Sequence, residues 1–162
     1  MPESGTQPRK RRSLRTILAF TLAVAACDAP SAPTEPDPEL PAGTRDFVTL
    51  MNAHRVEVGC SPLIWNARVA EVAQAHSEDM VARKFFGHDN PEGDSPFDRL
   101  EEAGVAYSRA AENIAYGFPD AGAVLEGWLD SPGHRANIEN CTLTEHGVGL
   151  ENTHWTHLFI RP

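Results

Sequence analysis

Three side chains in this sequence are of the types that metal-assisted chemistry uses: His88, Glu112 and His134. All three fall in predicted loops or at the ends of predicted elements, where functional residues concentrate. Two neutral imidazoles can bind Zn²⁺ or a similar ion, and a nearby carboxylate can hydrogen-bond the bound water or orient an imidazole. Such a set could support metal-assisted hydrolysis. Spacings of 24 and 22 residues do not by themselves bring the three together, and each alone is by default an exposed polar residue.

The other histidines fit structural roles better. His54 and His76 each fall on a predicted apolar helix stripe, which favours hydrogen-bonded core histidines over metal ligands. His154 and His157 lie three residues apart on a predicted strand, so they point to opposite faces and do not favour a shared metal. The chain has no G-x-S-x-G, P-loop, G-x-G-x-x-G or C-x-x-C motif.

Two long helices are predicted from apolar residues that recur at helical spacing. The first stripe consists of Phe47, Leu50, Met51, His54 and Val58. Gly59 is placed to end that helix. The second helix follows Asn66 as its N-cap, and its stripe consists of Val69, Val72, Ala73, His76 and Met80.

Two further helices are predicted mainly from their caps. Ser95-Pro96, with Asp98 three residues after the cap, indicates a short helix that stops near Gly104. Asp120 is expected to cap another helix, which Pro132-Gly133 breaks. One face of that helix consists of Ala121, Val124, Leu125 and Trp128.

The end of the chain changes to the period of two that is typical of strands. Residues 148–160 predict a hairpin around Asn152-Thr153, with a second strand that is apolar on both faces and therefore internal. Residues 111–116 could add another strand. Helices first and strands later predict an α+β fold, with helices packed on an antiparallel sheet.

The N-terminus has the pattern of a secretory signal. A basic cluster at residues 9–15 precedes an apolar run at residues 16–26, which is too short to cross a bilayer. The run ends in Val24-Ala25-Ala26-Cys27, which resembles a bacterial lipobox, so we expect a signal peptide over residues 1–27 and a lipid on Cys27. The alternative is a plain signal cut after Ala25, which would give a secreted protein.

The number of cysteines favours the lipobox interpretation of Cys27. If Cys27 carries lipid, then Cys60 and Cys141 remain as an even pair in an oxidising compartment, and we expect a disulfide between them. The alternative is two buried, unpaired thiols. Residues 28–44 contain five prolines and predict an extended linker, which leaves one folded domain over residues 45–162.

Charge excludes one class of partner. Residues 1–27 hold five basic residues and one acidic residue, so the rest of the chain, with nine basic and 22 acidic residues, has a formal net charge of −13. Such an acidic domain repels phosphate backbones, and we expect no nucleic-acid partner.

Six blocks in order resemble the bacterial branch of the CAP superfamily, which groups cysteine-rich secretory proteins, antigen five and pathogenesis-related proteins. The blocks are LMNAHRVEVGCSPLIWNARVAEVAQAHSEDM (50–80), FFGHDNPEGDSPFDRLEEAG (85–104), AENIAYG (111–117), GWLDSPGHRANI (127–138), EHGVGL (145–150) and HWTHLFIRP (154–162). The resemblance implies an SCP-like extracellular domain that is an α-β-α sandwich, with a central antiparallel sheet between helical layers.

The resemblance also implies a shared cavity in which two histidines and two glutamates converge. Three of these positions match His88, Glu112 and His134, although Ala111 replaces the usual glycine before the glutamate. The second glutamate is missing, since its position falls on Ser131, beside Asp130. His157 stands where relatives often have Gln, near the sheet.

We therefore expect an extracytoplasmic, lipid-anchored binding module of the bacterial envelope, in the periplasm or at the cell surface. Its His/Glu cavity would take a divalent metal such as Zn²⁺, bound weakly by His88 and His134, or a small-molecule, lipid or peptide ligand. The first alternative is a metal-dependent hydrolase of the envelope, with Glu112 as the candidate catalytic residue. The second is a structural envelope protein in which the cluster only stabilises the fold.

Overall fold

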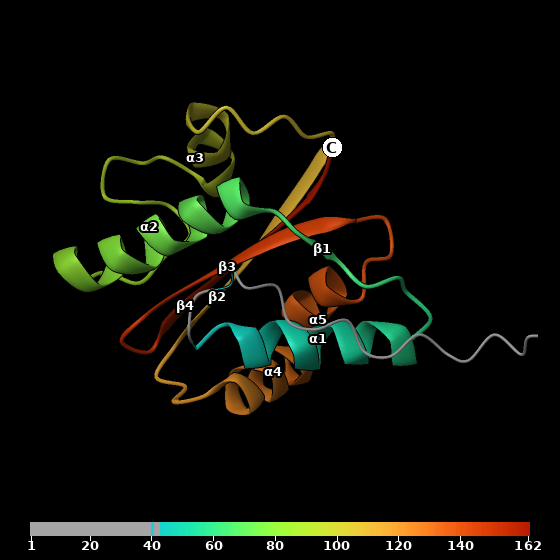
Figure 1. Ribbon diagram of the computed structural model, residues 1–162. Coiled ribbons are helices and arrows are strands. Elements are labelled where there is room, and N and C mark those ends of the chain that lie inside the picture. Colours follow the sequence, from blue (N-terminus) through green and yellow to red (C-terminus); the bar gives the residue numbers. More distant parts are fainter. Residues whose placement is uncertain (1–39, 41–42) are drawn as a thin grey trace, which may run out of the picture. The chain divides into compact units, whose positions relative to one another are not determined.

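The computed structural model describes Leu40 and residues 43–162 (Figure 1). The elements along the chain are α1 (Arg45–Glu57), β1 (Ile64–Trp65), α2 (Ala67–Arg83), α3 (Pro96–Glu102), β2 (Arg109–Tyr116), α4 (Ala121–Asp130), α5 (Pro132–Ile138), β3 (Glu145–Glu151) and β4 (His154–Arg161). The predicted signal peptide, Cys27 and most of the predicted linker lie outside the described residues. At the linker's end, Leu40 and Thr44 are buried. Among the described helices, none is long and apolar enough to cross a bilayer.

The sheet has the strand order β1-β3-β4-β2. β3 and β4 form the predicted antiparallel hairpin, and β2 pairs antiparallel with the other side of β4, so that Glu112 lies opposite Leu158. β4 is therefore internal, which confirms the expectation from its apolar faces. The short β1 pairs in parallel with β3, so the sheet is not wholly antiparallel.

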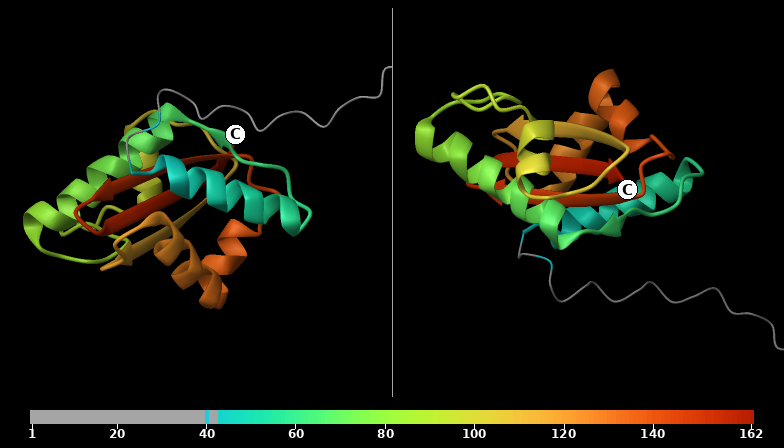
Figure 2. Two further views of the ribbon diagram at one scale, coloured as in Figure 1. Left: turned by 60° about the horizontal axis from the view of Figure 1, so that its bottom comes forward. Right: turned by 90° about the horizontal axis from the view of Figure 1, so that it is seen from above.

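Helices cover both faces of this sheet, which confirms the α-β-α arrangement (Figure 2). On one face, α1, α4 and α5 pack against β3 and β4 around Phe47, Trp128 and Ile138. On the other face, α2 and α3 pack around Val69 and Leu100. β4 supplies both cores because its side chains alternate: Trp155 and Phe159 enter the first, and Leu158 and Ile160 the second.

The predicted N-caps are present. The Asn66 side chain accepts hydrogen bonds from two backbone N–H groups of α2, and Asp120 accepts one at the start of α4. Ser95 and Asp98 form a reciprocal capping box, which fixes the start of α3 directly after the loop that carries His88.

One predicted stripe is partly wrong. Leu50 in α1 and Val58, just after its end, are 44% and 45% exposed, whereas Arg55 is buried. The guanidinium of Arg55 donates hydrogen bonds to the backbone carbonyls of Ile138 and Leu143, at 2.6 and 3.1 Å. Burial of this charge is tolerated because carbonyl groups far along the chain satisfy its donors, which helical spacing cannot reveal.

The structure contains a helix that the sequence pattern does not predict. α4 ends at Asp130, before the predicted break at Pro132-Gly133, but these two residues begin a new helix, α5, rather than a loop. Proline at the first helical position loses no hydrogen bond, since the first N–H groups of a helix have no partner within it. His134 therefore lies in a helix and not in a loop.

Two glycines of β3 bring α2 unusually close to the sheet. A Cβ atom on Gly147 would overlap backbone atoms of Val69 and Ala70, and one on Gly149 would overlap those of Ala73. The strand and helix backbones are in direct contact at these points, which leaves no room for a side chain.

The predicted disulfide is present between Cys60 and Cys141, which follow α1 and α5 and have Cα atoms 5.0 Å apart. Nearby, the Nε2 atom of His54 lies 2.9 Å from the Glu139 carboxylate. These contacts join two segments that are 81 residues apart.

Candidate functional site

Glu112 is the centre of a polar cluster built on β2. Its side chain is 2% exposed, and both of its oxygens accept hydrogen bonds. His88 Nδ1 donates to Oε1 at 2.8 Å, and Arg99 Nη2 donates to Oε2 at 2.8 Å. The His88 side chain is 50% exposed, so its imidazole covers the buried carboxylate and faces solvent.

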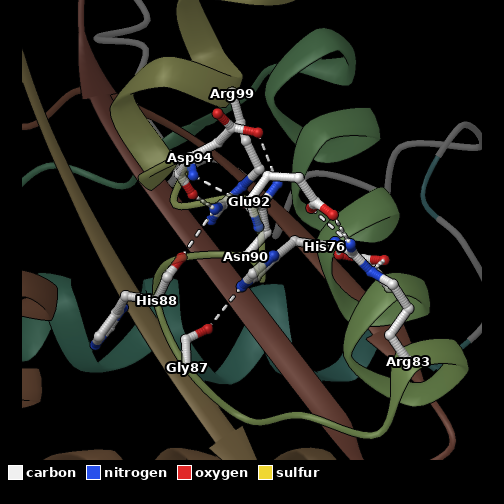
Figure 3. A network of polar contacts seen from close by, with 9 residues as sticks. His76, Arg83, Gly87, His88, Asn90, Glu92, Asp94 and Arg99 are labelled. Carbon is white, nitrogen blue, oxygen red and sulfur yellow. Dashed lines mark hydrogen bonds and ion pairs between the residues drawn. The ribbon is translucent and has the colours of Figure 1, made fainter.

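The loop that carries His88 is held by two helices (Figure 3). From α2, His76 Nε2 donates to the carbonyl of Gly87 at 2.9 Å. From α3, Arg99 Nη1 donates to the carbonyls of His88 and Asp94, at 2.8 and 3.0 Å. The backbone on both sides of His88 is thus fixed, and Arg99 holds the loop and Glu112 at the same time.

α5 is fastened to β2 by a pair of amide side chains. Asn137 Nδ2 donates to Oδ1 of the fully buried Asn113 at 2.8 Å, and Asn113 Nδ2 donates to the backbone carbonyl of His134 at 3.1 Å. Asn137 also approaches the carbonyl of Glu112, at 3.4 Å. These hydrogen bonds fix the backbone of His134 against β2.

The two imidazoles have opposite pKa shifts. The hydrogen bond to Glu112 raises the pKa of His88 above its ordinary value. Burial, followed by the neighbouring positive charge of His88, lowers the pKa of His134. As pH falls, the site therefore favours protonation of His88 before His134, and this order offers a proton donor beside an acceptor.

Asp130 and Ser131, expected beside this cavity, lie at the junction of α4 and α5. Asp130 is exposed and Ser131 is half-buried. In the described part of the chain, no hydrogen bond or ion pair joins either side chain to His88, Glu112 or His134.

A catalytic zinc centre does not fit these residues. Such a centre uses three protein ligands and keeps one position open. Glu112 already accepts from His88 and Arg99, so the cluster retains only two imidazoles as ligands. Over residues 43–162, no group of three or more His, Cys, Asp or Glu side chains is arranged to hold a metal ion.

His76 supports the site only through its contact with Gly87, and His154 and His157 point to opposite faces of the sheet, as their spacing predicted. His76 is a buried core histidine. His157 is buried on the α1 face, with its Nε2 atom 3.0 Å from His146 Nδ1. His154 has the opposite orientation in β4 and stacks on Tyr116, with ring centroids 4.4 Å apart.

Sequence reasoning missed three residues that build the site: Arg99, Asn113 and Asn137. Each lies inside one of the six blocks that carry the family resemblance. Their roles depend on contacts between separate elements, and no spacing within one element signals them.

Comparison with known proteins gives one family. The sequence model of the cysteine-rich secretory protein family, CAP, matches residues 48–157. The uncharacterized membrane protein YlbC of Bacillus subtilis (strain 168) is 42% identical over 117 residues, which are 72% of this chain and 34% of YlbC. The uncharacterized protein YkwD of the same organism is 35% identical over 140 residues, which are 85% of this chain and 54% of YkwD. The chain thus spans between a third and about half of these relatives.

Solved structures share the fold. An extracellular protein containing a SCP domain from Bacillus anthracis str. Ames matches with a TM-score of 0.70 and 38% identity, over 72% of this chain and 39% of that one. An outer surface protein from Borrelia burgdorferi matches with a TM-score of 0.67 and 18% identity, over 73% of this chain and 94% of that one. The second likeness concerns the fold alone.

Proposed function

Because the chain belongs to the cysteine-rich secretory protein (CAP) family, we propose that it is an extracytoplasmic binding module. Its site, formed by His88, Glu112 and His134, would hold a ligand without turning it over. The extracellular SCP-domain protein of Bacillus anthracis supports the location outside the cytoplasm. The lipid anchor at Cys27 is part of the same proposal, with residues 28–44 as the linker to the domain.

The hydrogen bonds and the burial of Glu112 favour binding over hydrolysis. A general base must accept a proton from water within hydrogen-bonding reach. Glu112 is the carboxylate of the cluster, and its two oxygens already accept from His88 and Arg99 inside a side-chain environment that is 2% exposed. A carboxylate held in this way orients His88 instead of activating water.

The geometry also indicates a ligand class. A protonated His88 presents its free Nε2–H to solvent, so the ligand should carry an anionic or strongly accepting group. Two residues before His88, Phe86 lines a cavity of about 450 Å³ together with Tyr116 and His154. Phe86 and Tyr116 are exposed rings that could cover an apolar tail. An amphiphile with a carboxylate, such as a fatty acid, matches both features.

The hydrolase alternative rests on one specific observation, the opposite pKa shifts of His88 and His134. A donor and an acceptor side by side can act as a general acid and a general base. Weak Zn²⁺ uptake by the two imidazoles is compatible with either function.

The pH dependence of two probes separates these functions. Calorimetric titration with oleate should show binding that weakens as pH rises through the raised pKa of His88, because the imidazolium is lost. Zn²⁺ uptake should change in the opposite sense and fall as pH drops through the same raised pKa of His88, because a metal ligand must be deprotonated. His88→Ala should weaken both, and His134→Ala should abolish Zn²⁺ uptake.

The matched control is His54→Ala, which removes a histidine that pairs with Glu139 outside the cluster. It should leave both titrations unchanged. Equal binding by all variants would place the ligand elsewhere. Peptide hydrolysis that depends on Glu112 would overturn the binding module in favour of the hydrolase.

A further inference from the structure

A pair of exposed aromatic rings lies at the end of the sheet where β3 turns into β4. Phe86 and Tyr116 are 53% and 60% exposed, and their ring centroids are 6.2 Å apart. The end of α2, the end of β2 and the turn between β3 and β4 line the cavity of about 450 Å³ beside these rings (Figure 1). Among the exposed large apolar residues of the described chain, no other two rings are in contact. Exposed apolar residues that stand singly are normal, whereas a contiguous patch marks an interaction surface.

The surface around the two rings carries almost no charge. We call this surface the aromatic edge, and define it by the residues that line the cavity, 80–81, 84–86, 116 and 152–154. None of these residues is acidic, and Lys84 is the only one with a permanent charge. The adjacent Arg83 is paired with two carboxylates, and Glu151, the nearest acid along the chain, does not line the cavity. A surface without acids is unexpected on a chain whose residues after 27 have a formal net charge of −13.

This composition suits the surface of a lipid bilayer. A tyrosine such as Tyr116 has an apolar ring and a polar end, and such side chains are enriched at the level of the lipid head groups. A long cationic side chain such as Lys84 can bury its methylene groups there and keep its ammonium group in water. Anionic head groups repel carboxylates, so the lack of acids removes the main electrostatic obstacle to contact.

The chain enters the domain at the same end of the sheet. Gly43 lies beside Leu150, since a Cβ atom on Gly43 would come within 3.3 Å of the Leu150 side chain. Leu150 precedes by two residues Asn152, which borders the cavity. The linker proposed for residues 28–44 joins Cys27 to this point, and at about 3.1 Å per residue it keeps this end of the domain within roughly 50 Å of the bilayer.

We propose that the aromatic edge docks on the surface of the bilayer that holds the lipid anchor. This inference rests on the anchor in the proposed function, and it adds an orientation, in which Phe86 and Tyr116 face the membrane. It also gives the proposed amphiphile a source, because the rings that would cover its tail lie in the lipid interface.

The test is sedimentation with vesicles of phosphatidylcholine. The polypeptide from residue 28 onward is used, because it contains every described residue and lacks both the signal peptide and the anchor. It should bind the vesicles through the aromatic edge alone. Phe86→Ser should lower the partition coefficient roughly fivefold, since the exposed half of the ring would no longer be buried in the interface. Tyr116→Ser should lower it in the same direction.

The matched control is Ile64→Ser. Ile64 is also exposed, but it lies in β1, at the opposite edge of the sheet from β2. It pairs with Glu145, at the end of β3 that is far from the turn. This variant should bind vesicles like the unsubstituted polypeptide. If it weakens binding as much as Phe86→Ser does, the contact is not specific to the aromatic edge and the proposal is wrong.

Phe86→Trp places a fluorescent reporter in the aromatic edge. Tryptophan is enriched at bilayer interfaces, so vesicle binding should be retained, and phosphatidylcholine brominated on its acyl chains should quench the added emission. The native residues Trp128 and Trp155 are buried, and Trp65 lies in β1, so their emission should be quenched far less. Absence of vesicle binding, or an added tryptophan that is not quenched, would overturn the docking.

Two separate measurements keep this inference distinct from the proposed function. Oleate binding in calorimetry without vesicle binding would retain the ligand site and reject the docking alone. Membrane fractionation of Cys27→Ser tests the anchor, and its outcome does not depend on the aromatic edge binding vesicles in isolation.

Discussion

Replacing Glu112 by glutamine should destabilise the protein by about 2 kcal/mol, because charged hydrogen bonds contribute about 1.5–3 kcal/mol each. The hydrogen bond to Arg99 accounts for most of this loss, since the side chains of Arg99 and Glu112 are 11% and 2% exposed. The hydrogen bond to His88 contributes less, since water can replace that partner. The glutamine side chain would keep an oxygen for Arg99, and a neutral His88 could shift its proton to Nε2 and accept from the new amide. The estimate is therefore the cost of one weakened charged bond rather than two lost ones.

The assay is urea denaturation of the wild type and of Glu112→Gln at two pH values. The raised pKa of His88 stabilises the fold below the unfolded value of about 6.5, and this stabilisation is lost as pH rises through the folded pKa. The cost of Glu112→Gln should accordingly be greater at pH 6 than at pH 8. In parallel, an NMR titration should show the pKa of His88 falling, because the hydrogen bond to the carboxylate is its main cause.

The control is Glu71→Gln, which breaks the exposed pair between Arg68 and Glu71. Exposed ion pairs contribute less than about 1 kcal/mol, so this variant should unfold nearly like the wild type. If Glu112→Gln costs no more than Glu71→Gln, and the His88 titration does not move, then Glu112 does not hold the site as described.

Three further results are expected. Intact-mass analysis under denaturing, non-reducing conditions should show Cys60 and Cys141 protected from alkylation, and reduction of this 81-residue loop should cost roughly 4 kcal/mol; two free thiols would contradict the bridge. Burial lowers the pKa of His146 to about 3 and holds the pKa of His157 well below its ordinary value. Stability should therefore fall as pH drops from about 6.5 towards 3, and His157→Gln should flatten that slope; an unchanged slope in the variant would refute this assignment. Cys27→Ser should move the protein from the membrane fraction to the soluble fraction, because acyl chains supply the proposed anchor; unchanged fractionation would rule the anchor out.

Periodicity and caps predicted most of the fold because they report on one element at a time. The stripe of α2 and the capping box of Ser95 and Asp98 depend only on local spacing. α5 was not predicted because it has seven residues and a single buried apolar side chain, Ile138, which is too little to show a helical period. β1 was not predicted for a similar reason, since two residues cannot show alternation.

The site was predicted only as far as the family resemblance reached. His88, Glu112 and His134 came from matched positions, and nothing in their spacing joins them. Arg99 illustrates the limit, because its role requires α3, β2 and the loop at Asp94 to meet. A basic residue on a short helix is ordinarily a solvated charge. Only the tertiary contacts show that Arg99 connects the loop that carries His88 to the Glu112 carboxylate.

The two glycines of β3 form a G-x-G pattern that serves close packing of a helix here. G-x-G is commonly associated with loops that approach a phosphate group, where the absence of a side chain lets a ligand come close. Here Gly147 and Gly149 lie in a strand, and what comes close is the backbone of α2. The same helix carries His76, which holds the loop before His88. For protein engineering, these positions set the distance between helix and sheet: any larger side chain would push α2 away from the sheet and move the loop that carries His88 with it.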